Sequence, residues 1–171
     1  MIRLVLADDH RIILEGLEQL FRRERDFQVL ATVTSGSDAL VAVRKHKPDV
    51  LVLDFQMPHG DGLSTLKAVR AENLHTRVVL LTATMDEDDV LDAMQAGVHG
   101  LVLKESAAVN LVNCVRRVAA GHRVLDEAMK SLLRPTAGLP TSRTPAAVDL
   151  TRSTSSISSR GKRFRISIRA R

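Results

Sequence analysis

One short run, Val50-Leu-Val-Leu-Asp54, constrains the fold of this chain more than any other stretch. Four branched apolar residues lead to a single carboxylate, and the turn formers Pro58, Gly60 and Gly62 follow. An apolar run of this length between turn residues is typical of a strand buried on both faces of a parallel sheet. Asp54 would then lie at the carboxyl edge of the sheet, where open α/β sheets bind their ligands.

The rest of the chain alternates strand and helix patterns. Periodicity predicts strands at 2–7, 27–33, 49–53, 77–82 and 100–103, and helices at about 10–23, 35–46, 63–72, 84–97, 106–121 and 125–133. Ser35, Thr84 and Ser106 are the predicted helix caps. Strict alternation predicts a parallel sheet with helices on both faces and right-handed crossovers. The expected fold is α/β, a doubly wound (βα)5 sheet in the flavodoxin-like strand order 2-1-3-4-5.

Composition excludes several classes of protein. Cys114 is the only cysteine, so neither an intrachain disulfide nor a cysteine-based metal site can form. The chain has no Trp or Tyr, which argues against aromatic stacking platforms for single-stranded nucleic acid. The N-terminus enters a strand pattern directly and no apolar run reaches transmembrane length. We therefore expect a cytoplasmic protein that does not enter a membrane.

Charge and composition change near residue 134. Residues 131–171 carry nine Lys or Arg and one Asp, a net charge of +8, whereas residues 1–130 carry 16 basic and 19 acidic residues, a net charge of −3. Such a polar segment buries too little apolar surface to offset a backbone ordering cost of ~1–2 kcal/mol per residue. The expected organisation is a folded domain at 1–120, a linker with a short helix at 121–133, and a disordered basic tail at 134–171.

Polar side chains end or follow four of the predicted strands, at one edge of the sheet: Asp8, Asp9, Asp54, Thr82 and Lys104. Strands one and three are neighbours at the topological switch point, which would bring the three carboxylates together. Crowded carboxylates repel unless a cation lies among them, and oxygen ligands without Cys or His favour Mg²⁺.

Each of these residues has a plainer interpretation when taken alone. Asp9 could cap a helix, Asp54 could form a turn, Thr82 could be a core hydroxyl and Lys104 a solvated charge. Their coincidence at successive strand ends favours one shared site. A carboxylate there can act as the nucleophile of phosphoryl transfer and form an aspartyl-phosphate. We predict Asp54 in that role, with Mg²⁺ and Lys104 neutralising charge on the transferring group and Thr82 donating its hydroxyl.

The chain resembles the receiver domain of two-component response regulators, of the NarL/FixJ type, over residues 1 to about 120. The resemblance rests on four motifs: Leu6-Ala-Asp8-Asp9-His10, Leu51-Val-Leu-Asp54-Phe-Gln-Met-Pro58-His-Gly-Asp-Gly62, Leu80-Leu-Thr82-Ala83 and Gly100-Leu-Val-Leu-Lys104-Glu105. It implies a phosphoacceptor, not an enzyme beyond self-catalysed phosphorylation and dephosphorylation, with Asp54 taking phosphate from a sensor histidine kinase. It also implies Mg²⁺ ligation by Asp9, Asp54 and the carbonyl of Gln56, with Asp8 assisting through water.

The resemblance further implies that Thr82 and Lys104 engage the phosphoryl group and that the output is transcriptional. A homodimer would form through the face of helix 84–97, strand 100–103 and helix 106–121, or through the helices 10–23 and 106–121. The chain departs from the family at Leu101, where an aromatic switch residue is usual, and at Glu105, where many receivers have proline. Residues 134–171 also lack a helix-turn-helix pattern, which this type of regulator uses to bind DNA.

Two other functions are weighed against a phosphoacceptor. One is a DNA-binding regulator that acts through the basic tail, where Arg160-Gly-Lys-Arg-Phe-Arg165 could contact phosphates without sequence specificity. The plainer interpretation of that segment is a solvated tail, or a remnant of a lost domain. The other is a flavodoxin-like enzyme that binds a nucleotide at the same edge. It is disfavoured because Asp8-Asp9 stand where a glycine-rich phosphate loop would follow the first strand.

Overall fold

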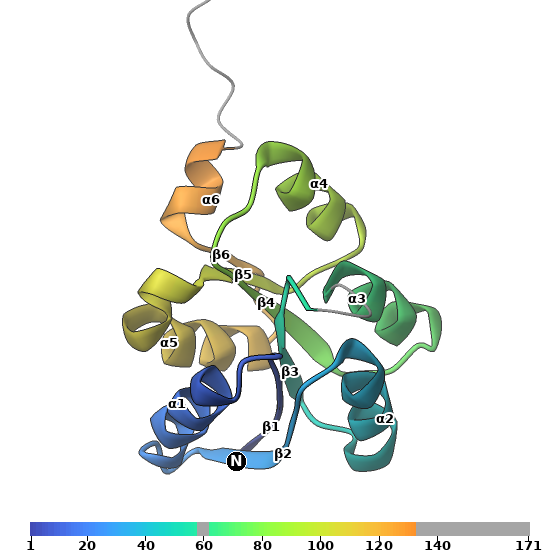
Figure 1. Cartoon of the computed structure of the whole chain (residues 1–171), viewed down its shortest axis with the longest axis vertical. Helices are drawn as coiled ribbons and strands as arrows, with labels where there is room; N and C mark the ends of the chain where they lie inside the picture. Colours follow the sequence, from blue (N-terminus) through green and yellow to red (C-terminus); the bar gives the residue numbers. More distant parts are fainter. Residues whose placement is uncertain (58–61, 133–171) are drawn as a thin grey trace, which may run out of the picture. The chain divides into compact units, whose positions relative to one another are not determined.

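The computed structural model describes residues 1–57 and 62–132, which alternate strands and helices as expected (Figure 1). The strands are β1 (Ile2–Ala7), β2 (Phe27–Val33), β3 (Val50–Asp54), β4 (Arg77–Thr82), β5 (Gly100–Leu103) and β6 (Val124–Leu125). The helices are α1 (Arg11–Arg22), α2 (Gly36–His46), α3 (Gly62–Ala71), α4 (Glu87–Gln95), α5 (Ala107–Ala119) and α6 (Glu127–Leu132), with a short 3₁₀ turn, η1 (Lys104–Ser106). The disordered tail predicted for residues 134–171 lies outside the described residues.

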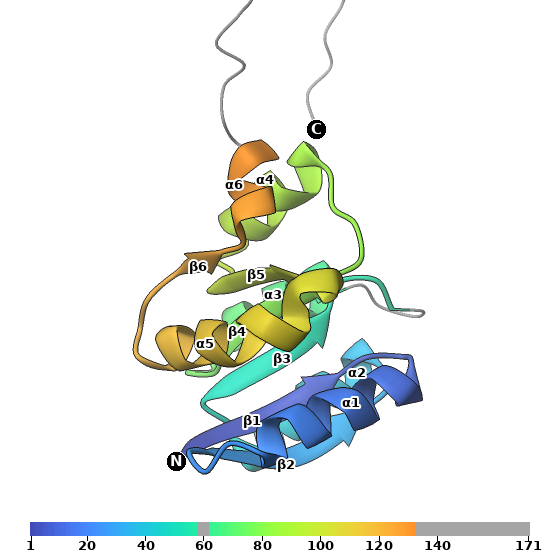
Figure 2. The same cartoon turned by 90° about the vertical axis from the view of Figure 1, so that its left-hand side faces the viewer.

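All six strands are parallel and lie in the order β2-β1-β3-β4-β5-β6. The predicted order 2-1-3-4-5 is confirmed, and β6, which the sequence did not predict, pairs with β5 at the edge. Helices α1 and α5 cover one face of the sheet, and α2, α3 and α4 cover the other (Figures 1 and 2). The fold is therefore doubly wound, with the carboxyl ends of β1 and β3 side by side.

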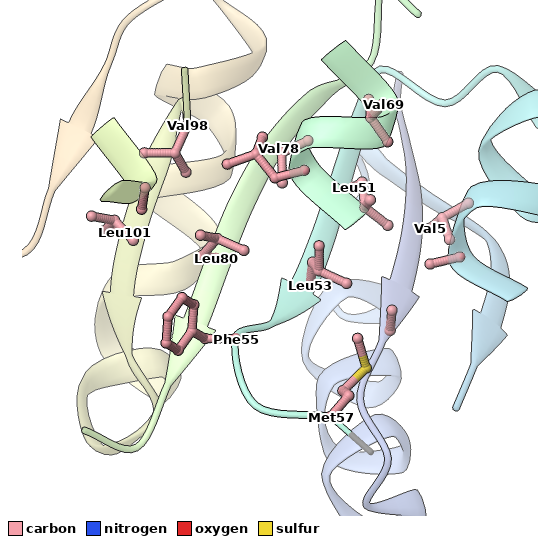
Figure 3. Packing of buried hydrophobic residues seen from close by; sticks show 14 of the residues in the cluster. Val5, Leu51, Leu53, Phe55, Met57, Val69, Val78, Leu80, Val98 and Leu101 are labelled. Carbon is pink, nitrogen blue, oxygen red and sulfur yellow. The ribbon is translucent and has the colours of Figure 1, made fainter. Parts of the chain in front are cut away.

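The core divides into two layers because successive strand residues point to opposite faces. Val5, Leu51, Leu53 and Leu80 pack under α2, α3 and α4, and Figure 3 shows part of this cluster. The intervening strand residues Leu4, Leu6, Val50, Val52, Val79 and Leu81 pack under α1 and α5. β3 is buried along its whole length, as its apolar run predicts. Asp54, the last residue of β3, is consequently held by a rigid strand.

Only the first of the three predicted helix caps is confirmed. Ser35 precedes α2 and its hydroxyl accepts a hydrogen bond from the backbone N–H of Asp38. The prediction that Thr84 caps the next helix was wrong. Asp86 immediately precedes α4, and its carboxylate accepts a hydrogen bond from the backbone N–H of Asp89. α4 therefore begins three residues later than the sequence pattern indicated.

Ser106 precedes α5 but does not cap it with its side chain. Its hydroxyl instead lies 2.5 Å from a carboxylate oxygen of Asp126 and 3.1 Å from the carbonyl oxygen of Leu103. Asp126 lies between β6 and α6, so this contact ties the end of β5 to the last helix. The predicted short helix is present as α6, and its Met129 is almost fully buried in the core layer under α4.

His99, just before β5, gives the fold a predicted sensitivity to acid. Its Nδ1 accepts a hydrogen bond from the backbone N–H of Val78 at 3.2 Å. Burial, and then the charges of Arg70, Arg123 and Arg77, lower the pKa of His99 from 6.5 to about 4. The folded state thus favours the neutral ring, a contribution that is complete above pH ~6.5 and is lost as the pH falls towards 4.

We expect the free energy of unfolding of the wild type to fall by roughly 2 kcal/mol more than that of His99→Asn between pH 7 and pH 4.5. Asparagine keeps an oxygen acceptor for Val78 but cannot take up a proton. Urea unfolding at both pH values measures the difference, with the exposed His75→Asn as the matched control. Identical pH dependence in wild type and His99→Asn would contradict this account.

Candidate functional site

Four charged side chains meet at the carboxyl edge of the sheet. Asp8 and Asp9 directly follow β1, Asp54 ends β3, and Lys104 directly follows β5. Lys104 Nζ lies 2.7 Å from Asp8 Oδ2 and 2.8 Å from Asp54 Oδ2, so one ammonium group bridges two carboxylates. The convergence predicted from the strand ends is therefore observed for these residues.

The bridged carboxylates are withdrawn from solvent. Asp8 is fully buried and Asp54 is 2% exposed, while Asp9 and Lys104 are half-buried at the rim. Asp54 Oδ1 also accepts a hydrogen bond from the backbone N–H of Gln56 at 3.2 Å. Gln56 itself is exposed, just beyond the end of β3.

Burial controls the charge states within this group. It raises the pKa of Asp54, an effect that Lys104 opposes through its hydrogen bond and that the negative charge of Asp8 reinforces. Burial acts to lower the pKa of Lys104, but the hydrogen bond to Asp54 and the close ion pair with Asp8 outweigh it, so the pKa of Lys104 is raised overall. Lys104 is therefore held in its charged form, and any further cation near Asp54 would favour its carboxylate.

His10 belongs to the same group, which the sequence interpretation missed. Its Nδ1 lies 2.9 Å from Asp9 Oδ1 and 3.3 Å from Asp8 Oδ1, and its backbone N–H donates to Asp8 Oδ1 at 2.9 Å. The expectation of a carboxylate cluster with no histidine nearby was wrong. The signal was present in the sequence, because His10 directly follows Asp8-Asp9.

The donor set suits a metal cation. Asp8, Asp9, His10 and Asp54 each offer a ligand atom, and these atoms lie within 4.8 Å of one another. Asp8 Oδ2 and Asp9 Oδ1 are buried and have no well-directed hydrogen bond among the described residues, although each lies close to a basic nitrogen. Burying three crowded carboxylates is costly; the ion pairs of Lys104 offset part of that cost, and a bound cation would offset more of it.

Thr82 and Leu101 are placed differently from the charged group. Thr82 ends β4 and is fully buried, but its hydroxyl donates to the carbonyl oxygen of Thr84 at 2.5 Å. Leu101 is fully buried in the core layer under α4, and its backbone carbonyl accepts from the N–H of Asp126. Neither side chain is bonded to the carboxylates in this conformation.

Comparison with known proteins gives a consistent result. The family model for the response regulator receiver domain matches residues 4–116. A nitrate/nitrite response regulator protein homolog of Haemophilus influenzae is 33% identical over 132 residues, which cover 77% of this chain and 64% of that protein. The nitrate/nitrite response regulator protein NarL of Escherichia coli K12 is 32% identical over 130 residues, covering 76% of this chain and 60% of that protein.

Solved structures agree with the sequence relatives. The signal receiver domain of the putative response regulator NarL from Mycobacterium tuberculosis superposes with a TM-score of 0.69 at 35% identity, covering 71% of this chain and 98% of that one. The two sequence relatives are longer proteins, and this chain spans less than two thirds of their length.

Proposed function

The chain belongs to the response regulator receiver family, and on this premise we propose that it is a two-component phosphoacceptor in which Asp54 takes up the phosphoryl group. The observation that carries the proposal is the buried ion-pair network in which Lys104 Nζ bridges Asp8 and Asp54. A lysine in that position can form an ion pair with a phosphoryl group on Asp54, because it already contacts one of the two carboxylate oxygens that could be phosphorylated.

The proposed chemistry is transfer between two nucleophiles. A carboxylate oxygen of Asp54 forms a bond to phosphorus while the bond from phosphorus to an imidazole nitrogen of the donor breaks, and that nitrogen leaves with its electron pair. The donor is proposed to be the phosphohistidine of a sensor histidine kinase. Lys104 would neutralise negative charge on the phosphoryl oxygens during the transfer and would remain paired with the product.

Mg²⁺ is the proposed cofactor. Asp8, Asp9, Asp54 and the backbone carbonyl of Gln56 would hold it, consistent with the crowded carboxylates and the two oxygens that lack a directed hydrogen bond. When bound, the ion would neutralise charge that spreads over the transferring phosphoryl group. His10 lies at the rim of this set, with its Nδ1 2.9 Å from Asp9 Oδ1, so His10 and a bound cation would compete for this oxygen.

Asp9→Asn should separate metal binding from folding. Removing one of three crowded carboxylates relieves repulsion, so the variant should unfold with a free energy equal to or about 0.5–1 kcal/mol above that of wild type without metal. Added Mg²⁺ should raise the melting temperature of wild type by mass action and leave that of the variant almost unchanged. Thermal unfolding with and without Mg²⁺ measures both effects, and equal Mg²⁺ stabilisation of the two proteins would contradict the assignment.

The proposed switch acts through Thr82. A phosphoryl group on Asp54 adds roughly −1.5 to −2 charges and three acceptor oxygens. The Thr82 hydroxyl would exchange the carbonyl of Thr84 for one of these oxygens, which would draw the start of the β4–α4 connection towards Asp54. Leu101 has no ring to gate this movement and is already fully buried, so the change in this chain would pass through backbone and packing.

The output and the assembly remain proposals. The relatives are named as response regulators, and a transcriptional output is proposed by analogy with them. We propose residues 1–120 as the receiver, 121–133 as a linker and 134–171 as a separate tail, with a homodimer through α4, β5 and α5 or through α1 and α5. Action on DNA through the basic tail is the alternative output.

No helix among residues 1–57 and 62–132 is long and apolar enough to cross a membrane, which is compatible with a cytoplasmic location.

Phosphorylation is tested directly with the purified chain. Incubation with acetyl phosphate and Mg²⁺ should add one phosphoryl group, detected by intact mass, and the modification should be base-labile, as expected of an acyl phosphate. Chelating the Mg²⁺ should suppress it. A chain that stays unmodified with both reagents, while an established receiver domain is modified in parallel, would overturn the proposed function.

A further inference from the structure

A second charged group lies at the opposite edge of the sheet. Arg70 is in the last turn of α3, Arg77 opens β4, and Arg123 lies between α5 and β6. The charges of all three act on His99, which directly precedes β5. Figure 3 shows that Val78 and Val98, the neighbours of Arg77 and His99, lie at the far end of the strands from Phe55, the neighbour of Asp54.

Two of these arginines, Arg70 and Arg77, line a cavity together with His99. A volume of about 330 Å³ is lined by Arg70, Asn73, Leu74, His75, Thr76, Arg77 and His99. No acidic side chain lines it. A neighbouring cavity of about 510 Å³ shares several of these residues and adds Lys47 and Asp49. The Asp49 carboxylate accepts a hydrogen bond from the backbone N–H of Arg3 at 2.7 Å. Among the described residues it forms no ion pair with Arg70 or Arg77.

The three arginines have no counter-charge in the part of the chain that the structure describes. No carboxylate among residues 1–57 and 62–132 forms an ion pair with any of them. Other arginines of this chain are paired: Arg44 with Glu72, and Arg116 with Glu24 and Asp26. Two unpaired arginines in one cavity wall, with a third arginine acting on the same histidine, raise the local positive potential, which attracts anions.

The backbone at Gly97 allows the Arg70 side chain to approach closely. Gly97 has a φ of +84°, and a Cβ there would lie 3.2 Å from Nε of Arg70. The Arg70 guanidinium therefore lies directly against the turn that leads into β5. Since Nδ1 of His99 accepts from Val78, its proton is on Nε2, which adds a neutral N–H donor to the cavity wall.

We propose that this cavity binds a small anion with two or more phosphate groups, such as pyrophosphate or the polyphosphate of a nucleotide. The guanidinium groups of Arg70 and Arg77 line the cavity, and each can donate two parallel hydrogen bonds to phosphate oxygens, while the nearby charge of Arg123 adds to the positive potential. A single phosphate would leave part of the positive charge uncompensated. The site lies apart from the carboxylates around Asp54 and does not depend on the proposed phosphorylation.

The test is titration of the whole chain with inorganic pyrophosphate, in EDTA and at physiological salt, by isothermal calorimetry. We expect saturable one-to-one binding that weakens about tenfold or more in Arg70→Gln and in Arg77→Gln, because each variant loses a charge-assisted contact. Arg22→Gln is the matched control, since Arg22 is an exposed arginine already paired with Glu18. It should bind like wild type.

Two further arms identify the ligand and the location. ATP should bind at least as well as pyrophosphate and orthophosphate more weakly, whereas a preference for duplex DNA over both small anions would point to nucleic acid and overturn the proposal. Asp54→Asn should bind pyrophosphate like wild type, which separates this site from the phosphoacceptor. Absence of saturable binding, or equal loss in Arg22→Gln and Arg70→Gln, would reduce the cluster to a solvated basic patch.

Discussion

Asp54→Asn should remain unmodified by acetyl phosphate and Mg²⁺ under conditions in which the wild-type chain is labelled. An amide has no carboxylate oxygen to attack phosphorus, so no acyl phosphate can form at this position. The fold should survive, because Lys104 keeps Asp8 as its partner at 2.7 Å and asparagine matches the shape of aspartate. Intact mass before and after base treatment measures the labelling, and thermal unfolding checks the fold.

Asp92→Asn is the matched control for this experiment. Asp92 is an exposed carboxylate on α4 at which the same substitution should leave labelling unchanged. Labelling of Asp54→Asn to the wild-type extent would show that another residue accepts the phosphoryl group. Loss of labelling in both variants would show that the assay reports on surface charge and would also count against Asp54.

Gly62→Ala should destabilise the chain by about 2 kcal/mol or more, because there is no room for a methyl group at that position. A Cβ on Gly62 would lie 2.4 Å from the carbonyl oxygen of Asp54 and 2.9 Å from Cα of Phe55, and both are backbone atoms of a buried segment. The Gly62 N–H also donates to the carbonyl of Phe55 at 2.8 Å. Relief of the clash must move the start of α3 away from the end of β3.

Gly16→Ala, the same chemical change at another position, should have the opposite effect on stability. Gly16 lies inside α1, with no atom within 4 Å of an added Cβ. Alanine there should stabilise the chain by about 0.5–1 kcal/mol, because it restricts the unfolded backbone. Urea unfolding measures both variants. Equal effects would mean that the close approach at Gly62 is relaxed at little cost, and the tight junction beside Asp54 would then be disproved.

Gly62→Ala also links stability to the site. Displacement of α3 would disturb the end of β3, where Asp54 accepts the N–H of Gln56. We therefore expect slower phosphorylation in the folded fraction of Gly62→Ala and normal phosphorylation in Gly16→Ala. The contrast follows from the position of the two glycines: Gly62 lies against the backbone of Asp54, and Gly16 lies on an exposed helix surface.

Residue patterns alone predicted most of the elements. Strands at 27–33, 77–82 and 100–103 agree with β2, β4 and β5 at both ends. Short apolar runs between turn residues have few other stable environments than a buried parallel strand, so these segments are strongly specified. The sequence missed β6 because two residues, Val124 and Leu125, are too short for any periodicity to be recognised.

Caps and hydroxyl partners were harder to predict. Thr84 and Ser106 carry the right side chains for helix caps, but Thr84 competes with a second capping residue nearby and Ser106 finds a partner that only the folded chain supplies. Asp86 takes the cap of α4, and Asp126, twenty residues away in sequence, accepts the hydroxyl of Ser106. Local sequence rules consider neighbours within a turn, so they could have weighed Asp86 against Thr84 but not a partner as distant as Asp126.

The sequence by itself determined that three carboxylates and a lysine end or directly follow strands of one parallel sheet, because chain direction and strand order follow from strict alternation. Only the tertiary structure decided the pairing within that group: Lys104 bridges Asp8 and Asp54, His10 contacts Asp9, and Thr82 donates elsewhere. The physical reason is that strand order brings residues to the same edge, whereas hydrogen bonds depend on side-chain directions set by packing from both faces of the sheet.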